Sequence, residues 1–415
     1  MIRGSRITSS ASRKVKELTK PYANELDLLL GENQATALER ERNTFDLMTA
    51  PFSRRLVIFG AGRLGRDALR TLRRHGWEML AFSDSESAKW GKEIDGMKVL
   101  SPHDAARGFG LTAAFVVTIS ARGGDFLPLC RKLLDLGCAK IVPYRSLFWK
   151  YPDDCPPHLV ADRPCRVLQE KKEIRAVLDL FWDDTSRCEY VGQLRWRLLQ
   201  DFGALPAPSG EKQYFPPDII TLRPGEVFVD CGAYNGDTLR PFLRRCPGFA
   251  RVLALEPDPA NFARLTGFIG GLPADVRKRL SARIVCVGEK RGKVRFAAGG
   301  GETSKVSVQG ETAVECETLD EICSGDDPTY VKMDIEGAEL DALRGAERLL
   351  RRSEAMWAVC VYHKPEHLWQ LPLFISEHSQ GHRFFLRKYA GEIWETVCYA
   401  VPESRLANTE AGSSV

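Results

Sequence analysis

The sequence predicts an α/β protein with two doubly wound domains joined by helices. Apolar runs of strand length alternate with helical patterns in two separate regions, and proline-rich sequence at residues 152–164 divides them. The chain has 415 residues, and because about 100 to 200 residues per domain is usual, two domains are expected. The expected order is a helical N-terminal segment (1–50), a small α/β domain (51–150), a helical linker (151–215), a larger α/β domain (216–402) and a disordered tail (403–415).

Composition narrows the classes of function. A net charge of +4 over this length is nearly balanced, so nucleic acid is not an implied partner. The longest apolar stretch, residues 111–119, is far shorter than the roughly 20 residues that cross a bilayer, so no membrane span is expected. The basic residues 1–20 lack the apolar core of a secretory signal. The twelve cysteines include no Cys-x-x-Cys pair, which favours free, buried thiols and a cytoplasmic protein.

The small domain carries a glycine-rich turn between a strand and a helix. A strand over residues 56–59 precedes Gly60-Ala-Gly62-Arg-Leu-Gly65, a helix follows, and the next strand ends at Asp84. This context matches the dinucleotide-binding fingerprint. Three interpretations stay open: a nicotinamide dinucleotide, a nucleotide or nucleotide-linked sugar, or no ligand, with the glycines serving only close packing of helix on strand.

The larger domain has a second turn of this kind, Val-Phe-Val-Asp-Cys-Gly-Ala-Tyr-Asn-Gly-Asp over residues 227–237. Its small residues let backbone approach a ligand, and we expect free N–H groups there, at the carboxyl edge of a parallel sheet. A pyrophosphate prefers such a turn without a nearby carboxylate. Asp230 and Asp237 instead suit the cationic, phosphate-free methionine end of S-adenosylmethionine, so charge favours this cofactor.

The next strand, over residues 252–256, ends in an acid. Glu256 lies about 20 residues beyond Gly236, the placement from which a carboxylate accepts both ribose hydroxyls of an adenosine. We therefore expect Glu256 to bind the ribose. The alternative is that Asp230 and Glu256 are merely solvated strand ends.

Two later strands predict the reaction centre. The strand over residues 330–333 delivers Asp334 and Glu336 to the same edge, and the strand over residues 356–362 precedes His363. Methyl transfer needs alignment and a base that removes one proton from an alcohol. We expect His363 or Asp334 to be this base, with Glu336 as a further catalytic residue.

Each of these residues has an ordinary structural alternative. His363 is otherwise a packed or surface imidazole, and Glu336 otherwise a charge that favours the start of a helix. A divalent metal held by Asp334, Glu336 and His363 is conceivable, but the spacing is unspecific, so no metal site is expected.

Four motifs in order resemble those of the FkbM family of methyltransferases. They are Asp-Cys-Gly-Ala-Tyr-Asn-Gly-Asp from residue 230, Glu-Pro-Asp-Pro from 256, Val-Lys-Met-Asp-Ile-Glu-Gly-Ala-Glu-Leu from 331 and Val-Tyr-His-Lys from 361. The similarity runs over residues 178–401. The resemblance implies a class I Rossmann-like methyltransferase domain that moves a methyl group from S-adenosylmethionine, usually to a hydroxyl of a sugar or secondary metabolite.

The resemblance also implies cofactor contacts at particular positions. These are Asp230, Gly232, Asn235, Gly236 and Asp237 in the first loop, Glu256 at the ribose with Asp258 close by, and backbone around Val287 at the adenine. The acceptor implied is a small molecule or a saccharide, and oxygen as the methylated atom follows from the resemblance alone.

The first domain resembles the small Rossmann-like nucleotide-binding domains of sugar-modifying acyltransferases. The likeness rests on Ile-Phe-Gly-Ala-Gly from residue 58, Ala-Phe-Ser-Asp from 81 and Ile-Asp-Gly-Met-Lys-Val-Leu from 94. A sugar methyltransferase that binds a carrier nucleotide at this first domain would account for both resemblances. Two other functions compete: an NAD(P)-dependent oxidoreductase that uses the glycine-rich turn, and a nucleotide-sugar-binding or scaffold protein without turnover.

Overall fold

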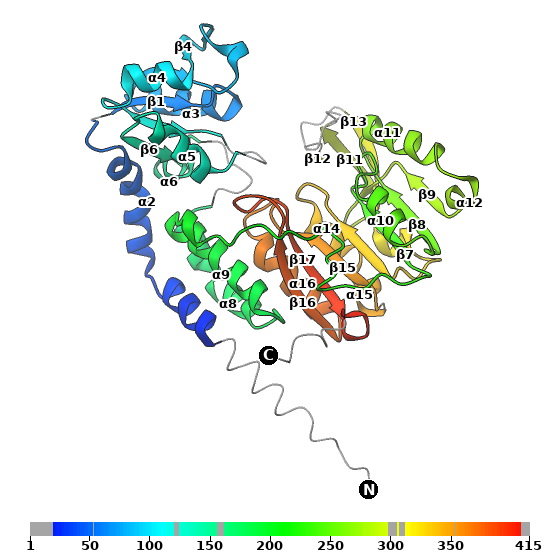
Figure 1. Cartoon of the computed structure of the whole chain (residues 1–415). Helices are drawn as coiled ribbons and strands as arrows, with labels where there is room; N and C mark the ends of the chain where they lie inside the picture. The colour runs from blue at the N-terminus through cyan, green and yellow to red at the C-terminus, as the bar shows by residue number, and fades with distance from the viewer. Residues whose placement is uncertain are drawn as a thin grey trace, which may run out of the picture.

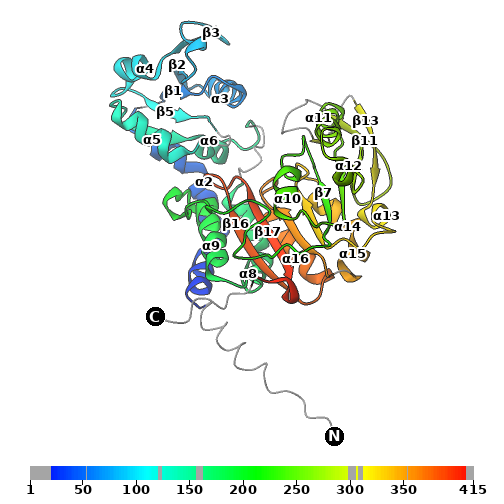
Figure 2. The same cartoon turned by 45° about the vertical axis from the view of Figure 1, so that its right-hand side comes forward.

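The computed structural model describes residues 20–52, 54–119, 124–155, 162–297, 305–306, 312–352 and 354–407. Two α/β domains are visible, with helices α8 and α9 between the first domain and strands β16 and β17 of the second (Figures 1 and 2). Along the chain, the α/β domain of β1 to β6 comes first, then these helices, and then the α/β domain of β7 to β17.

The N-terminal domain is built on a six-stranded sheet of order β3-β4-β2-β1-β5-β6. All neighbours pair in parallel except β3 with β4. The strands are β1 (Arg55–Phe59), β2 (Glu78–Ser83), β3 (Glu93–Ile94), β4 (Met97–Leu100), β5 (Ala114–Val117) and β6 (Lys140–Pro143). The helices are α3 (Arg63–Arg74), η1 (Ser87–Lys89), α4 (Pro102–Phe109), α5 (Phe126–Asp135) and α6 (Tyr144–Lys150). Because the strand order reverses beside β1, the glycine-rich turn after β1 lies where doubly wound sheets bind ligands.

Helices near the N-terminus connect the two hydrophobic cores. Residues 20–30 are helical, and α2 (Gln34–Thr49) follows, begun by Asn33, whose side chain accepts from the Thr36 N–H. Leu26 and Leu30 belong to the core cluster of the C-terminal domain. Phe45 belongs to that of the N-terminal domain. The helical region over residues 20–49 thus packs against both hydrophobic cores.

The helices expected as a linker are part of the C-terminal core. They are α7 (Pro164–Val167), η2 (Leu168–Glu170), α8 (Lys171–Leu178), α9 (Asp184–Leu199) and η3 (Phe202–Ala204). Ile174, Tyr190 and Leu194 are fully buried in the same cluster as the sheet residues of the second domain. The hydrophobic spacing that predicts these helices is therefore explained by packing on the sheet.

The C-terminal domain has a seven-stranded sheet of order β16-β17-β15-β14-β7-β8-β9. Only β17 runs antiparallel to its neighbours. The strands are β7 (Val227–Cys231), β8 (Arg251–Leu255), β9 (Leu280–Arg283), β14 (Tyr330–Met333), β15 (Met356–Cys360), β16 (His382–Lys388) and β17 (Thr396–Pro402). The helices are α10 (Leu239–Arg245), α11 (Pro259–Gly270), α12 (Ala274–Arg277), α13 (Leu319–Ile322), α14 (Glu339–Arg344), α15 (Glu347–Arg352), α16 (His367–His378) and η4 (Glu403–Arg405). The strand order reverses between β7 and β14.

A four-stranded sheet beside the main one was not expected. It comprises β10 (Cys286–Val287), β11 (Gly292–Ala297), β12 (Lys305–Val306) and β13 (Thr312–Glu317) in the order β10-β13-β11-β12. The apolar segment over residues 283–287 does not form one strand, because β9 ends at Arg283 and the chain turns outward at Ile284, which is 44% exposed. The residues of β10 then pair with β13.

The ordered chain also continues past Pro402, where a disordered tail was expected. Residues 403–405 form η4, and Arg405 is buried in an ion pair with Glu226. Leu406 bridges to Ile220. A buried carboxylate that needs a cationic partner explains why this segment is held.

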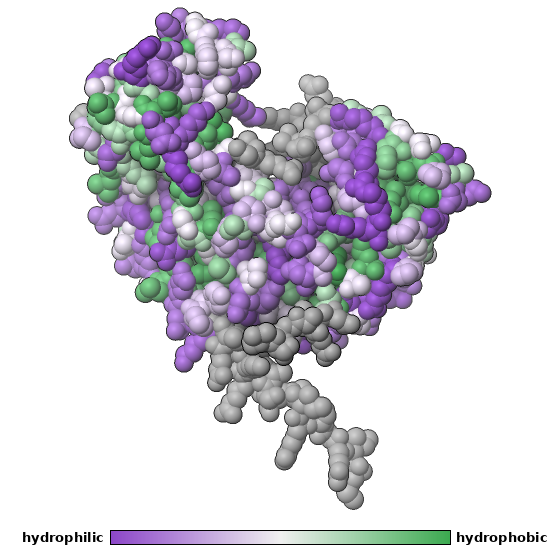
Figure 3. Space-filling view, viewed as in Figure 1, coloured by the Kyte–Doolittle hydropathy of each residue, from purple (hydrophilic) through white to green (hydrophobic). Residues whose placement is uncertain are grey.

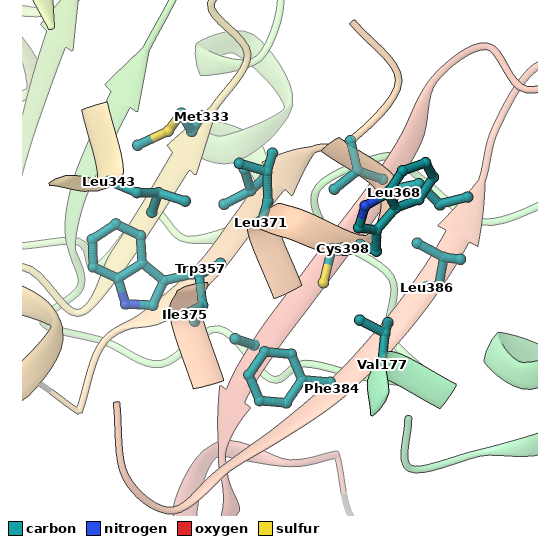
Figure 4. Packing of buried hydrophobic residues seen from close by; sticks show 14 of the residues in the cluster. Val177, Met333, Leu343, Trp357, Leu368, Leu371, Ile375, Phe384, Leu386 and Cys398 are labelled. Atoms are coloured by element: carbon teal, nitrogen blue, oxygen red, sulfur yellow. The ribbon is translucent and has the colours of Figure 1, made fainter. Parts of the chain in front are cut away.

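The core beneath the sheet is made by aliphatic and aromatic side chains from distant segments. Figure 4 shows Trp357 of β15 and Leu371 and Ile375 of α16 facing Phe384 and Leu386 of β16. Each such side chain stabilises the fold by about 1.5 to 3 kcal/mol when removed from water.

On the face seen in Figure 3, hydrophilic residues predominate and hydrophobic residues form separate patches. None of the helices that the structure describes has the length and apolar composition needed to cross a membrane. All twelve cysteines are unpaired, and ten of them are buried.

Candidate functional site

The carboxyl ends of four parallel strands meet at one edge of the C-terminal sheet. β7 ends at Cys231, β8 at Leu255, β14 at Met333 and β15 at Cys360, and predicted site residues follow each of them. In a doubly wound sheet this edge, next to the reversal of strand order, is where ligands bind. The predicted cofactor and catalytic residues therefore share one edge.

A buried ion pair joins β7 to β14 at this edge. Asp230 and Lys332 are register partners, and Lys332 Nζ lies 3.0 Å from Asp230 Oδ1. Burial raises the pKa of Asp230 to about 6, although Lys332 offsets part of that shift. Burial would lower the pKa of Lys332, but the surrounding carboxylates, Asp230 first, raise it instead. Lys332 therefore stays cationic, and it donates to the Gly232 carbonyl at 2.7 Å.

The loop after β7 requires glycine at its first bend. Gly232 has φ +79°, and a Cβ there would lie 1.9 Å from the Asp334 carbonyl oxygen. Tyr234 and Gly236 also have positive φ, +47° and +84°. The small residues predicted at this loop thus let the end of β14 approach it closely.

Four of the N–H groups of this loop are not free, contrary to expectation. Those of Gly232 and Ala233 donate to the Leu255 carbonyl, at 3.0 Å each. Those of Tyr234 and Gly236 donate to Glu256 and Ala233, both at 2.8 Å. The loop can therefore lie close to a ligand, but these four N–H groups are not available to donate to it.

Glu256 is buried at the end of β8. Its two carboxylate oxygens accept from the N–H groups of Tyr234 at 2.8 Å and Asp258 at 2.9 Å. Burial raises the pKa of Glu256 to about 7, and the two backbone donors offset part of the rise. A carboxylate has about four acceptor positions, so Glu256 retains capacity for the two hydroxyls of a ribose.

The other residues expected at the cofactor have different environments. Asp258 is fully buried as the N-cap of α11, where its side chain accepts from two backbone N–H groups. Asn235 is half-buried and accepts from Arg240, whereas Asp237 is exposed. Val287 is buried in β10, in the sheet beside the main one. Asp258 therefore has a structural role in the loop after β8.

The two buried groups of the cofactor side fit S-adenosylmethionine. Neither oxygen of Asp230 accepts a well-directed hydrogen bond, although the residue is fully buried. Lys332 offsets the charge of Asp230 at 3.0 Å, so Asp230 offers a ligand acceptor oxygens rather than a free charge, and the carboxylate of Glu256 suits a diol. Both carboxylates can accept hydrogen bonds from the ligand that the sequence predicts.

Asp334, at the end of β14, is held by a tyrosine. The hydroxyl of Tyr214 donates to Asp334 Oδ2 at 2.7 Å. Tyr214 is buried with φ +67°, and its own N–H donates to the hydroxyl of Tyr399 at 3.0 Å. The second oxygen of Asp334, Oδ1, lies 3.4 Å from His363 Nε2.

His363 is buried between carboxylates. Its Nδ1 lies 2.7 Å from Glu339 Oε1, and its Nε2 lies 3.8 Å from Glu336 Oε1. Burial opposes the charged imidazole, but Glu339, together with Asp334 and Glu336, raises the pKa of His363 to about 9. Burial alone would raise the pKa of Glu339, yet His363 and His367 hold it well below its usual range.

The structure thus brings the three predicted catalytic residues together. Asp334, Glu336 and His363 each offer one ligand atom within 4.8 Å of the others. We call these residues the Asp334–Glu336–His363 cluster. Its position next to Gly232 and Lys332 puts it beside the predicted cofactor loop.

Three residues of the site were not predicted: Tyr214, Lys332 and Glu339. Lys332 had a signal, because a lysine within an apolar strand needs a buried carboxylate partner and Asp230 ends a neighbouring strand. Glu339 could be seen only as a helix-start charge. Tyr214 is too far from Asp334 in sequence for spacing to connect them.

The glycine-rich turn of the N-terminal domain is tightly packed at two of its three glycines. A Cβ on Gly65 would lie 1.9 Å from the Gly60 carbonyl oxygen, whereas none of the described atoms lies within 4 Å of a Cβ on Gly62. Asp84 Oδ2 accepts from the Ala61 N–H at 2.8 Å and pairs with Lys89 at 3.1 Å. These contacts and that of the Glu86 N–H outweigh burial and lower the pKa of Asp84.

Two sequence comparisons relate part of this chain to known methyltransferases. Residues 230–399 match the family model of the methyltransferase FkbM domain. The hexuronic acid methyltransferase AglP of Haloferax volcanii is 33% identical over 146 residues, which cover 32% of this chain and 57% of that protein. The chain therefore matches just over half the length of this relative.

A solved structure resembles nearly the whole chain. The crystal structure of methyltransferase FkbM from Methylobacillus flagellatus KT superposes with a TM-score of 0.70 at 20% identity, covering 90% of this chain and 99% of that one. This likeness confirms the predicted Rossmann-like methyltransferase fold.

Proposed function

Because residues 230–399 belong to the FkbM methyltransferase family, we propose that this enzyme transfers the methyl group of S-adenosylmethionine to a hydroxyl oxygen of a saccharide. The observation that carries the proposal is the meeting of two sites at one sheet edge. Glu256 and the loop after β7 form one, and the Asp334–Glu336–His363 cluster forms the other.

S-adenosylmethionine supplies a methyl group bonded to positively charged sulfur. In this proposal Glu256 accepts the ribose hydroxyls, the loop from Gly232 to Gly236 lies along the methionine part, and backbone near Val287 contacts the adenine. Asp230 offers acceptor oxygens to the methionine part. Lys332 positions the loop through its bond to the Gly232 carbonyl.

The cluster serves the acceptor. The acceptor oxygen forms a bond to the methyl carbon while the carbon–sulfur bond breaks and leaves its electron pair on sulfur. The hydroxyl proton passes to Asp334 or His363, the two groups that we propose as the base, and then to solvent. Tyr214 fixes Asp334 through one oxygen and leaves the other facing His363, which supplies the alignment that an in-line displacement needs.

A saccharide acceptor is supported by the relative from Haloferax volcanii, whose name assigns it hexuronic acid as substrate. Methylation at oxygen is proposed from the family resemblance, and the carboxylate and imidazole at the edge could serve as the base that it needs. We also place the enzyme in the cytoplasm, because a reducing compartment suits twelve unpaired cysteines.

For the N-terminal domain we propose a nucleotide or a nucleotide-linked sugar at the turn after β1. Gly62 is the N-cap of the 12-residue helix α3, has no side-chain cap, and has open space at its Cβ position. A phosphate would fit there. Packing alone accounts for Gly60 and Gly65, so this proposal depends on Gly62.

Titration calorimetry of the full chain tests both sites. We would titrate separately with S-adenosylmethionine, NADH and a nucleotide-linked sugar, and then incubate with labelled cofactor and a panel of saccharides that includes hexuronic acids. We expect micromolar cofactor binding and transfer of label to a saccharide. Asp334→Asn should keep cofactor affinity within about twofold and lose methyl transfer about 100-fold or more, because general-base catalysis contributes that much.

The outcomes separate the competing functions. Binding of NADH without S-adenosylmethionine would overturn the proposal in favour of an oxidoreductase. Cofactor binding without transfer to any acceptor would favour a binding protein. Nucleotide-sugar binding that Gly62→Val abolishes would support the second site.

A further inference from the structure

We propose that the Asp334–Glu336–His363 cluster binds one divalent metal ion that holds oxygen atoms of the acceptor at the sheet edge. The sequence alone did not lead us to expect a metal here, because the spacing of the three residues is unspecific. The proposal rests on the proposed function for what the ion does, but not for whether the ion binds.

The two separations from His363 Nε2 match those of metal ligands, and the ligand atoms of all three residues lie within 4.8 Å of one another. His363 Nε2 lies 3.4 Å from Asp334 Oδ1 and 3.8 Å from Glu336 Oε1. Metal–ligand bonds of about 2.0 to 2.4 Å place two ligands about 2.8 to 3.4 Å apart at right angles and about 3.3 to 3.9 Å apart in a tetrahedron. An ion would therefore fit between these atoms with little movement of the protein.

The nitrogen that faces the two carboxylates is buried without a hydrogen-bond partner. His363 is 1% exposed, and its Nε2 has no such partner among the described residues. A buried polar atom of this kind needs an explanation. Because the pKa of His363 is raised to about 9 in the metal-free protein, a metal ion that bound the lone pair of Nε2 would displace a proton from it.

Glu339 orients the imidazole for this task. Its Oε1 lies 2.7 Å from His363 Nδ1, and when it accepts the Nδ1 proton, Nε2 presents its lone pair to Asp334 and Glu336. This carboxylate–histidine arrangement recurs behind metal-bound histidines because it fixes the tautomer and the ring.

The same carboxylate holds the loop that carries Glu336. Glu339 Oε1 also accepts from the N–H groups of Ile335 at 3.1 Å and Gly337 at 3.3 Å. Between them Glu336 has φ +56°, an uncommon conformation for a residue with a side chain. Backbone strain at Glu336 thus coincides with its placement beside His363.

Asp334 is fixed in a similar way, by the hydroxyl of Tyr214 on Oδ2. The cluster and Glu339 together bring three carboxylates to the imidazoles of His363 and His367, an excess of carboxylates whose negative charge a divalent cation would offset. One imidazole with two carboxylates suits ions that accept both nitrogen and oxygen, such as Mn²⁺ or Zn²⁺, and oxygen-preferring Mg²⁺ less.

Three protein ligands leave coordination positions open. We infer that these take oxygen atoms of the acceptor, such as adjacent hydroxyls or a hydroxyl and a carboxylate of a sugar acid. A bound cation lowers the pKa of a coordinated hydroxyl and fixes its direction. With the ion bound, His363 is a ligand and cannot act as the base, so the hydroxyl proton would pass to a carboxylate of the cluster.

The experiment uses Mn²⁺ as probe on the full chain after treatment with a chelator. The unbound ion is counted by electron paramagnetic resonance, and calorimetry is repeated with Mn²⁺, Zn²⁺ and Mg²⁺. We expect one saturable site per chain. Glu336→Gln should weaken Mn²⁺ binding by about tenfold or more, because even changes behind a metal ligand cost that much.

Asp341→Asn is the matched control, since Asp341 lies on α14 with its side chain 54% exposed and outside the cluster. It should bind Mn²⁺ like the unaltered protein. Weaker Mn²⁺ binding by Glu336→Gln than by Asp341→Asn, with the same circular dichroism spectrum for both variants, would support the site. Absence of a saturable site for all three ions, or equal binding by both variants, would overturn it.

Cofactor titration of the same metal-free protein separates this inference from the proposed function. S-adenosylmethionine binding without any metal site would leave the methyltransferase proposal intact and refute the metal. A saturable metal site without S-adenosylmethionine binding would support the metal and refute the methyltransferase proposal.

Discussion

At the scale of single residues, the protonation of Glu256 should govern cofactor affinity. Burial raises its pKa to about 7 in the free protein, and an ionised carboxylate accepts hydroxyl donors better than a neutral acid. We predict that affinity for S-adenosylmethionine falls by up to about tenfold per pH unit below pH 7 and levels off above it. Calorimetry at a series of pH values measures this slope.

Variants of this carboxylate make the prediction specific. Glu256→Gln should bind the cofactor about tenfold or more weakly, since a hydrogen bond to a charged group contributes about 1.5 to 3 kcal/mol, and should lose the pH dependence. Glu315→Gln, an exposed carboxylate of β13 in the same domain, should behave like the unaltered protein. The same slope in Glu256→Gln would contradict the assignment.

Stability should change with pH in the opposite sense. Because the pKa of Glu256 is raised in the folded protein, its contribution to stability is fully present below the unfolded value and is lost as the pH rises through about 7. A rise in pH through about 7 therefore favours cofactor binding, because Glu256 ionises, but lowers the stability of the cofactor-free protein.

The sequence pattern indicates the acidic residues of the site but not the side chains that contact them. Asp230, Glu256 and Asp334 directly follow or end apolar strands, a pattern visible without coordinates. Their partners depend on strand register and on contacts between distant segments, as with Lys332 across from Asp230 and Tyr214 on Asp334.

At the scale of elements, the packing of α3 on β1 depends on one glycine. A Cβ on Gly65 would lie 1.9 Å from the Gly60 carbonyl oxygen. Although alanine is favoured over glycine by about 1 kcal/mol within a helix, we predict that Gly65→Ala destabilises the protein by about 1 to 3 kcal/mol, as overpacking does. Denaturant unfolding measures the loss.

Gly62→Ala is the companion variant in the same turn. Gly62 has φ −82° and open space at its Cβ position, so Gly62→Ala should lower the stability by about 1 kcal/mol or less, the cost of alanine in place of glycine at an N-cap. Equal effects of the two substitutions would show that close packing is not what Gly65 supplies.

The elements that sequence predicted well are those with buried apolar runs. The central parallel strands β1, β7 and β14 lie at residues where the sequence has such apolar runs. The sheet of β10 to β13 was missed, because short strands with mixed burial lack a clear period.

At the scale of the whole molecule, a buried contact joins the domains. The guanidinium of Arg145, on α6, lies 3.9 Å from the ring centroid of Trp196, on α9, and the Phe126 N–H donates to Glu392 at 2.8 Å. Arg145 and Trp196 are both buried. The glycine-rich turn and the reaction centre are therefore parts of one packed body.

Removing the indole should uncouple the domains. We predict that Trp196→Ala lowers the free energy of unfolding by about 3 to 5 kcal/mol and divides a single calorimetric transition into two. Trp182→Ala, whose side chain is 41% exposed, should cost less than about 1 kcal/mol. A single undivided transition in Trp196→Ala would argue against coupling through this contact.

The position of Tyr214 has a consequence for shortened forms of the enzyme. The family match begins at residue 230, yet the hydroxyl that holds Asp334 comes from residue 214, and Tyr330 donates in turn to the Tyr214 carbonyl. A fragment that began at residue 230 would keep the four motifs and lose the hydroxyl that holds Asp334. We therefore expect a minimal active fragment to start upstream of Tyr214.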